Sequence, residues 1–584
     1  MDLPLTRRER AARVALLPTW AARPFEASAW LVLGAVLVLV LATFRDYGVA
    51  WDEQGETVYG ALLLKYYGSF FHDHSAYQFV NFRFYGGGFE LPSAILSRLL
   101  PFGEYETRHL LSALLGVLGL FATWRLGASV GGERVGLLSL LLLVVNPTWY
   151  GHMFINARDV PFASGIACCL LSTSRAIDEL PRVRFRTAVL FGLALGMTMS
   201  VRVGGVVALV FLSVSLALFV AARARAGAEP RVLARDAGKI AVSLLPALVV
   251  AYAVLGALWP WAVESPLNPV RALLMFSRFP FDGMNLFDGR LVPAQGLPAA
   301  YLPVLLAVKL PEVVLAGIAF AVAAFAVALL RRPRALLDAT GIRLATVAFA
   351  AAFPIVYFVV LRPVDYNGMR HYMFVVPPLT VLAAVGVDRV FSALPSRPLQ
   401  AALGIALVPL AVGPLRALYA LHPDQYVYFN ALVGGPRGAH GRYELDYWGT
   451  SLADATRALV EQLERRGELP HHGHTPLKVY VCGNVWSAAV FFPDGLVATS
   501  RIGDADFQIA IDQFYCSHPP QSRRVLGVTR EGALLSYVDD LRETHTAERV
   551  AVPELPPGHD DLAGIPTTET AWQRPGPSTG VPED

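Results

Sequence analysis

The chain has 584 residues, of which 54% are hydrophobic and only 16% are charged, and its mean hydropathy is +0.46. This composition excludes an ordinary water-soluble globular protein and indicates an integral membrane protein. The net charge of +3 is small for the length, and the basic residues form short clusters rather than a stripe, so a nucleic-acid partner is not expected.

Eleven stretches are apolar enough to be predicted as membrane spans, which need about 20 residues each. The first contains LVLGAVLVLVLATF, lacks a convincing small-residue cleavage site, and is interpreted as a retained anchor. The fifth and sixth are short and separated only by Arg202, so the count is open by one or two. The predicted spans lie near residues 27–44, 108–124, 135–150, 160–177, 187–201, 203–221, 239–259, 311–330, 343–361, 371–391 and 399–419.

Basic clusters orient the chain. RRERAAR precedes the first span, and every second connection is also basic, including PRVRFR at 181–186 and RRPR at 331–334. By the positive-inside rule these segments are cytoplasmic, so the stretch YGVAWDEQGE after the first span lies outside. An odd number of spans sends the C-terminal region outside as well. Richness in Ala, Arg, Gly and Leu suggests a GC-rich bacterium, so we expect a multi-pass protein of the bacterial inner membrane.

The character of the chain changes after the last span. LKVYVCGNVWSAAVFF and FQIAIDQFYC are strand-like, whereas SLADATRALVEQLERRG is typical of an amphipathic helix. We therefore predict an α-helical multi-pass protein with a small C-terminal α/β domain. The predicted parts are a basic cytoplasmic N-terminus at 1–26, a membrane region at 27–419 with outer loops at 45–107 and 260–300, the extracytoplasmic α/β domain at 420–545, and a disordered Pro-rich tail at 546–584.

Four cysteines fall into two pairs. Cys168 and Cys169 are adjacent inside a predicted span, where a structural role is expected. Cys482 and Cys516 both fall in the predicted outer domain, and an oxidising compartment would allow them to form a bridge. Spacing does not decide between bridged and free thiols.

Ionisable residues gather at the outer ends of the predicted spans, where charges are costly and are functional candidates by default. Carboxylates there are suited to activating a nucleophile or holding a cation, and Arg or Lys to binding a phosphate leaving group. The candidates are Asp52, Glu53, Asp159, Arg202, Lys309, Arg362, Asp365, Arg370 and His371.

Each of these signals also has a simpler explanation. The Asp52–Glu53 pair is compatible with a solvated loop start, and Asp159 before a proline with an ordinary helix opening. Lys309 can place its ammonium at the membrane interface while its stem stays apolar, and Arg370 can be an interfacial anchor. The location of all of them on one side is the stronger observation.

Other patterns are weaker. His72, Asp73 and His74 are spaced like metal ligands, and HHGH occupies 471–474, but solvated loops are the better interpretation of both. The sequence has no Walker loop, dinucleotide fingerprint, G-x-S-x-G elbow or C-x-x-C pair, which argues against an ATP-driven pump.

Four segments together resemble a known family. They are DYGVAWDE after the first span, NPTWYGHMFINARDVPFA, AVKLP and RHYMF. In combination they look like the GT-C-fold membrane glycosyltransferases, and most like the bacterial relatives of the protein O-mannosyltransferases and of the aminoarabinose transferase that modifies lipid A. The segment HPDQYVYFNALVGGPRGAHGRYELDYWGT also looks like a motif of bacterial members.

The resemblance implies transfer of a sugar from a polyprenyl-phosphate donor to an acceptor at the outer face, with inversion at the anomeric carbon. Asp52 matches the family's general base, with Glu53 beside it, and Asp159 matches its later acidic residue. The implied partners are the lipid-linked donor, membrane lipids, and an acceptor that is a protein, a lipid or a glycan. A divalent cation stays open, because His72, His74 and Glu90 match no known ligand set. The residues implied at the donor phosphate are Lys309 and Arg370, with Arg202, Arg362 and His371 as weaker candidates.

Two other functions are compatible with many spans. A transporter or flippase for a lipid-linked sugar would also place charges near the membrane, but it would more often show internal repeats and broken helices at the midplane, and no repeat is visible. If the protein were a binding or assembly protein that acts through its C-terminal domain, the acidic segment DYGVAWDE would have no explained function. The sequence therefore favours the enzyme.

Overall fold

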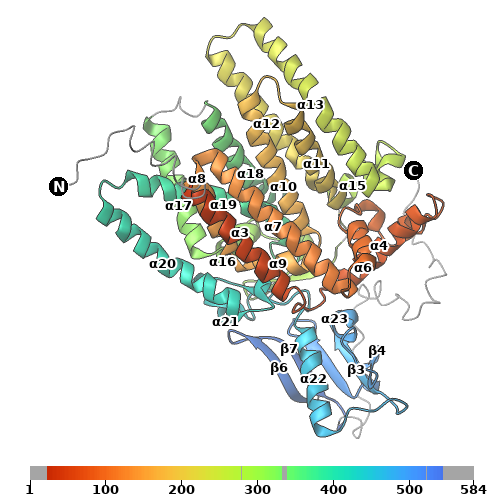
Figure 1. Cartoon of the computed structure of the whole chain (residues 1–584). Coiled ribbons are helices and arrows are strands. Elements are labelled where there is room, and N and C mark those ends of the chain that lie inside the picture. Colours follow the sequence, from red (N-terminus) through yellow and green to blue (C-terminus); the bar gives the residue numbers. More distant parts are fainter. Residues whose placement is uncertain (1–22, 278, 280, 332–337, 521, 544–584) are drawn as a thin grey trace.

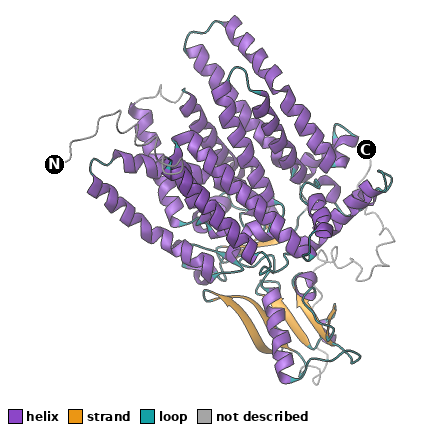
Figure 2. Ribbon diagram, viewed as in Figure 1, coloured by secondary structure: helices purple, strands orange, loops and turns teal. Residues whose placement is uncertain are grey.

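The computed structural model describes residues 23–543 except 278, 280, 332–337 and 521. The predicted N-terminal basic segment therefore lies almost entirely outside the described residues, and the predicted tail at 546–584 lies entirely outside them. The described chain forms a large helical bundle and a smaller domain with a β-sheet, which sits at one end of the bundle (Figures 1 and 2).

All eleven predicted span segments are helical. Among the described residues, eight helices have the length and apolarity to cross a membrane, and two further bent pairs bring the number to as many as ten. The remaining segment is α11, Phe185–Val201, which is shorter. The eight are α3 (Pro24–Thr43), α7 (Glu104–Gly131), α10 (Asp159–Glu179), Val203–Arg225 with η2 and α12, α13 (Pro230–Leu258), α18 (Ala339–Leu361), Arg370–Ala393 with η5 and α19, and α20 (Arg397–Ala420).

The predicted span at 135–150 is broken, and the predicted span at 311–330 is preceded by a sharp bend. Helix α8 (Glu133–Val144) meets α9 (Pro147–Ile155) at 67°, and α16 (Tyr301–Lys309) meets α17 (Glu312–Arg331) with a bend of 117°. The first break carries its own cap, because the Asn146 side chain accepts hydrogen bonds from the first backbone N–H groups of α9. At the second break, the Asn430 side chain donates hydrogen bonds to two backbone carbonyls, as described below.

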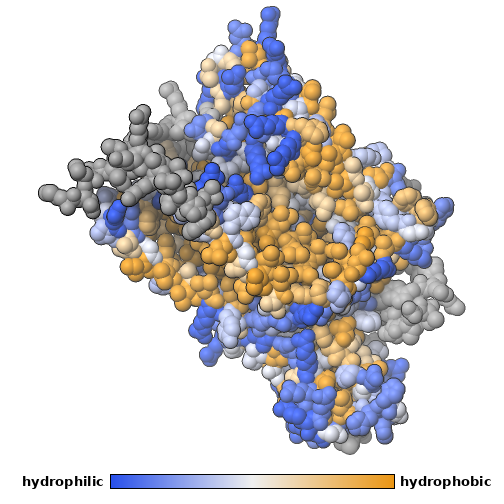
Figure 3. All heavy atoms as spheres, viewed as in Figure 1, coloured by the Kyte–Doolittle hydropathy of each residue, from blue (hydrophilic) through white to orange (hydrophobic). Residues whose placement is uncertain are grey.

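The surface of the bundle is that of a membrane protein. On the face seen in Figure 3, apolar side chains form a broad band across the helices, and polar side chains gather at the tip of the α12–α13 hairpin and on the sheet domain. Many apolar side chains of α13 and α20 point outward, including Val249 at 68% and Ile405 at 71% exposure. In water such exposure would be unfavourable, whereas lipid tails cover it without cost. The chain is therefore a multi-pass membrane protein.

The predicted outer loops are structured. Residues 45–103 contain α4 (Glu53–Gly68), α5 (Ser75–Gln78), η1 (Phe82–Phe84) and α6 (Glu90–Leu99), and residues 260–300 contain α14 (Pro260–Glu264), α15 (Asn268–Ser277), β1 (Met284–Phe287), β2 (Arg290–Pro293) and η3 (Ala294–Gly296). The glycines of YGGGFE allow a close approach, since a Cβ on Gly86 or Gly88 would collide with the backbone of Ser200. Gly88 N–H donates to the Ser200 carbonyl at 2.9 Å, which fixes the start of α6 against the end of α11.

The C-terminal domain has a five-stranded mixed sheet in the order β4-β3-β5-β7-β6. The strands are β3 (Leu477–Cys482), β4 (Leu496–Thr499), β5 (Phe507–Ile511), β6 (Arg523–Arg530) and β7 (Ala533–Asp540). Strand β3 is parallel to β4 and β5, and β7 is antiparallel to β5 and β6. The apolar face of α22 (Leu452–Arg466) packs with the sheet in one core, and α23 (Val485–Ala489) follows β3. Cys482 and Cys516 are joined by a disulfide, which settles that open alternative.

Residues 421–450 connect α20 to α22 and do not join the sheet. They contain η6 (Gln425–Val427), η7 (Ala431–Val433) and α21 (Gly435–Ala439), and their apolar side chains belong to the main core of the bundle. We call residues 421–450 the junction segment. Its contacts with the membrane helices are close, since a Cβ on Gly151 of α9 would collide with the backbone of Tyr426.

Candidate functional site

The site lies where α4, α9, α10 and the junction segment meet. Trp51 N–H donates to the Trp448 carbonyl at 3.0 Å, and Asn484 of the sheet domain donates to the Trp51 carbonyl at 2.7 Å. The loop that carries Asp52 is thus held by the junction segment and by the sheet domain. A small pocket opens beside it, lined by Ala50, Asp52, Glu53, Glu56, Ile155, Asn156, Ala157, Arg158, Arg370 and Trp448.

Arg370 is the centre of the charged residues that the sequence predicted. Its Nη1 lies 3.6 Å from the Asp52 carboxylate and 3.5 Å from the Asp159 carboxylate. Asp159 also pairs with Arg202 at 2.7 Å. The guanidinium of Arg370 packs against the rings of Tyr366 and Trp448, at 4.9 and 5.2 Å from their centroids. Four of the predicted residues, from four separate segments, therefore form one cluster.

The carboxylates of this region differ in accessibility. The Asp52 side chain is 46% exposed, whereas Asp159 is only 2% exposed and Glu53 is also 2% exposed. Glu53 accepts the Ala50 N–H at 2.8 Å and contacts His109 Nε2 at 3.1 Å. These contacts occupy the Glu53 carboxylate and hold the turn before α4. Of Asp52, Glu53 and Asp159, only Asp52 presents its carboxylate to incoming molecules.

Next to this cluster lies a second group of buried charged side chains, which the sequence did not predict. Glu56 pairs with Arg108 at 2.6 Å and with Arg158 at 2.7 Å, and Glu90 lies 3.6 Å from Arg158. All four side chains are buried or nearly so. Buried ions require such pairing, because desolvation of an unpaired charge is costly. The sequence carried a weak signal for Arg158, which directly precedes Asp159, but Glu56 and Arg108 resemble ordinary charged residues near a helix start.

Three predicted phosphate-binding residues form no ion pair with Asp52 or Asp159 in the described part of the chain. Lys309 Nζ donates to the Tyr426 carbonyl at 3.1 Å and lies 3.9 Å from the centroid of the Phe429 ring. No carboxylate among the described residues is within 4 Å of it. Arg362 is exposed at the C-terminus of α18 and forms no ion pair with any described residue. His371 Nδ1 is 2.6 Å from the Asp365 carboxylate.

Burial shifts the titration of two acids in this region. It raises the pKa of Asp365 to about 8, with Arg370 opposing the shift. It also raises the pKa of Glu444 to about 8, and the neighbouring Asp365 charge adds to that shift. Burial therefore disfavours the charged form of both acids.

Metal-ligand geometry is not found in the described part of the chain, where no three His, Cys, Asp or Glu side chains converge on one point. His72 contacts the Ser69 carbonyl at 2.9 Å, and Asp73 pairs with Lys65 at 2.7 Å. In HHGH, His472 is 93% exposed and lies 3.4 Å from Asp494. These side chains lie in solvated loops, as the sequence suggested.

Fold and site together define a multi-pass membrane protein with a compact acid and arginine cluster between its helices and a disulfide-bonded sheet domain. No protein-family model and no curated protein sequence matches the chain.

Among solved structures, the chain is similar to ArnT from Cupriavidus metallidurans in the apo state, with 14% identity, coverage of 88% of this chain and 98% of that one, and a TM-score of 0.46. The same protein bound to undecaprenyl phosphate gives 16% identity, the same coverage, and a TM-score of 0.45. The oligosaccharyltransferase AglB from Archaeoglobus fulgidus, with an inhibitory peptide and a dolichol-phosphate, gives 12% identity over 84% of this chain and 70% of that one, with a TM-score of 0.45.

Proposed function

We propose that this protein is a membrane glycosyltransferase. It transfers a sugar from a polyprenyl-phosphate donor to an acceptor hydroxyl or amine at the extracytoplasmic face, with inversion. The acceptor atom attacks the anomeric carbon, the bond from that carbon to the phosphate oxygen breaks, and the acceptor proton passes to Asp52. The reaction needs one base and one positive clamp for the leaving phosphate.

The observation that carries the proposal is the exposure of Asp52 next to a buried arginine cluster. A general base must reach the proton that it abstracts. Among the described residues, the half-exposed Asp52 carboxylate has only one long ion pair, at 3.6 Å, whereas Asp159 is enclosed by Arg202 and Asn156. Asp159 therefore orients the arginines, and Asp52 is the base.

Arg370 and Arg202 form the clamp. Each has a buried Nε that lacks a hydrogen-bond partner among the described residues. Buried donors without partners are unfavourable unless a ligand satisfies them, and guanidinium groups match phosphate geometry. Charge that develops on the leaving phosphate would be stabilised there. Arg158 lines the same pocket and offers a third guanidinium.

The outer location of the site is supported by two observations. The predicted cytoplasmic connection at 222–239 lies at the end of the bundle opposite the sheet domain (Figure 1). The sheet domain contains the disulfide between Cys482 and Cys516, a bond that persists in oxidising compartments. The donor would keep its prenyl tail in the bilayer while its phosphate reaches the cluster.

A transporter of lipid-linked sugars is the second candidate, and the two bent helix pairs favour it, because transporters often use broken helices at the membrane midplane. The α16–α17 break lies beside the junction segment instead. Asn430 of that segment donates to the carbonyls of Ala307 and Leu310 at 2.7 and 2.8 Å, which provides hydrogen-bond partners at this corner. The α8–α9 break is capped locally by Asn146. Both breaks thus have their own hydrogen-bond partners within the chain, which fits the enzyme better.

The test is the variant Asp52→Asn in purified protein, with radiolabelled polyprenyl-phosphate sugars and measurement of label leaving the lipid. We expect transfer to be abolished while the protein still inserts and unfolds at the normal temperature. The matched control is Asp46→Asn, since Asp46 lies in the same loop, is 47% exposed, and pairs with His422 rather than with the cluster. Its activity should stay near that of the wild type.

Full transfer by Asp52→Asn would refute the assignment of the base. Absence of transfer by the wild-type protein with every donor, together with movement of labelled lipid across vesicle membranes, would establish the transporter instead.

A further inference from the structure

The junction segment contains the motif RYELDYWGT, which the proposed base and clamp do not use. Its end is fixed by Asp446, whose carboxylate accepts the backbone N–H groups of Thr450 and Ser451 at 3.0 and 3.1 Å and also bonds the Tyr426 hydroxyl. The two residues that follow Asp446 are thereby held in place. They are Tyr447 and Trp448, which are 7% and 2% exposed.

Trp448 lines the pocket with Asp52 and Arg370. Its backbone carbonyl accepts the Trp51 N–H and so holds the loop of Asp52, and its ring packs against the Arg370 guanidinium. Its indole Nε1–H is buried and has no partner among the described residues. A buried N–H that lacks an acceptor costs stability, so its persistence at a pocket wall indicates that a ligand atom accepts the bond.

Tyr447 has a hydroxyl proton that its contact with His152 does not use. The side-chain oxygen Oδ1 of Asn156 accepts the Asp159 N–H at 2.8 Å, which fixes the orientation of the side-chain amide. Asn156 Nδ2 therefore donates to Asp159 at 3.0 Å and to His152 Nδ1 at 3.1 Å. Because His152 accepts at Nδ1, its proton is on Nε2, which donates to the Tyr447 oxygen at 3.2 Å. The Tyr447 O–H must then donate to another atom.

We propose that Tyr447 and Trp448 form the subsite for the transferred sugar, with the Tyr447 O–H and the Trp448 N–H donating to sugar hydroxyl oxygens. This inference rests on the proposed function and deepens it. Both donors are neutral, whereas the adjacent arginines already supply charged donors for a phosphate. Aromatic rings also pack well against the apolar C–H face of a sugar. The junction segment thus selects the sugar, and the membrane helices supply the base and the clamp.

The test uses Tyr447→Phe and Trp448→Phe, which keep an aromatic ring and remove one donor each. Purified protein in detergent is given undecaprenyl phosphate carrying tritiated mannose, glucose, galactose or arabinose, and then the single-deoxy analogues of the best substrate. With the full sugar, each variant should lose about tenfold in kcat/KM for the donor. With the analogue that lacks the matching hydroxyl, wild type and variant should be equal, because the contact is already absent.

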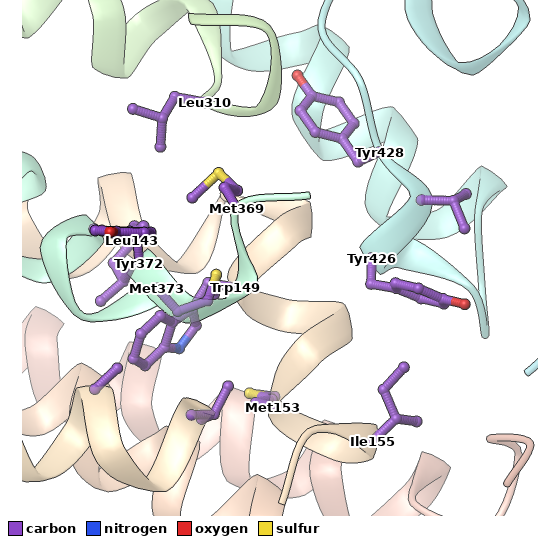
Figure 4. Packing of buried hydrophobic residues seen from close by; sticks show 14 of the residues in the cluster. Leu143, Trp149, Met153, Ile155, Leu310, Met369, Tyr372, Met373, Tyr426 and Tyr428 are labelled. Carbon is purple, nitrogen blue, oxygen red and sulfur yellow. The ribbon is translucent and has the colours of Figure 1, made fainter. Parts of the chain in front are cut away.

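Trp149→Phe is the matched control. The Trp149 indole N–H is also buried without a described partner, but the ring packs in the apolar core beside Leu143, Met153 and Met373 rather than at the pocket (Figure 4). This variant should keep the wild-type response to every deoxy analogue. Thermal unfolding verifies the fold of each variant, and Tyr447→Phe alone decides the proposal if Trp448→Phe does not fold.

Two results would overturn the subsite. One is that Tyr447→Phe and the folded Trp448→Phe discriminate deoxy analogues as strongly as the wild type does. The other is that only acceptor saturation changes. In either case the wild type still transfers sugar, so the failure is distinct from that of the proposed function, which is refuted by a wild type that transfers from no donor.

Discussion

Arg370 offers the sharpest test of how the site handles the leaving phosphate. At an effective dielectric constant of about 20, a unit charge about 3.5 Å from the guanidinium interacts with it by about 5 kcal/mol. Asp52 and Asp159, at 3.6 and 3.5 Å, already neutralise part of the Arg370 charge, so the interaction with the phosphate is weaker than this value. Removing one preorganised donor of this kind costs about 3 kcal/mol of transition-state stabilisation, or about 100-fold in rate.

We therefore expect Arg370→Ala to lower kcat/KM for the lipid-linked donor about 100-fold, with a much smaller change in acceptor saturation. The protein should still fold, because Asp159 keeps Arg202 at 2.7 Å. Arg370→Lys retains the charge but not the planar fork, and should fall in between, at about tenfold.

Arg362→Ala is the control for this series, since Arg362 lies only eight positions earlier in the chain but is exposed and has no ion pair among the described residues. Initial rates at varied donor and fixed acceptor concentrations measure the effect. Donor kcat/KM within threefold of wild type for Arg370→Ala would refute the clamp. Equal losses of donor kcat/KM in the Arg370 and Arg362 variants would show that the net positive charge of the protein, and not a specific phosphate site, determines use of the donor.

Two further predictions concern carboxyl groups near the site. Glu53→Gln should lower the unfolding temperature in detergent by several degrees, since it removes a buried charge from its contact with His109 and costs about 2 kcal/mol. It should retain far more activity than Asp52→Asn, and normal stability with abolished transfer would instead make Glu53 the base. Asp365→Asn should flatten the pH dependence of stability between about pH 4 and 8. Burial raises the pKa of Asp365 to about 8, so the folded state keeps a proton that the unfolded state loses above about pH 4, and stability falls as pH rises. An unchanged slope of unfolding temperature against pH would contradict the second prediction.

The helices and part of the cluster could be predicted because local sequence determines them. Apolar runs of the required length became helices, and residues at the outer ends of four different segments met at Arg370. These residues come together because charged side chains at one membrane face are costly to bury unless they pair with one another.

Other residues required knowledge of tertiary geometry. Lys309 is predicted at the donor phosphate, and the contact of its ammonium with the Tyr426 carbonyl could not be read from any local pattern. Arg108 opens an apolar helix and appears in sequence to be a solvated terminus, and only folding of the first outer loop over it reveals its burial beside Glu56. Tyr447 lies almost 400 positions from Asp52, and no local pattern could connect them.

The contribution of Trp448 to the pocket has a consequence for how the molecule matures. The membrane helices are complete at Ala420, yet the wall of the pocket beside Asp52 is supplied by chain that emerges from the ribosome later and, in the proposed topology, must still cross the bilayer. A nascent chain in that topology that is inserted but not yet translocated at its C-terminus has an unfinished pocket. The proposed topology thus implies that the site becomes complete only after the C-terminal region has reached the outer face.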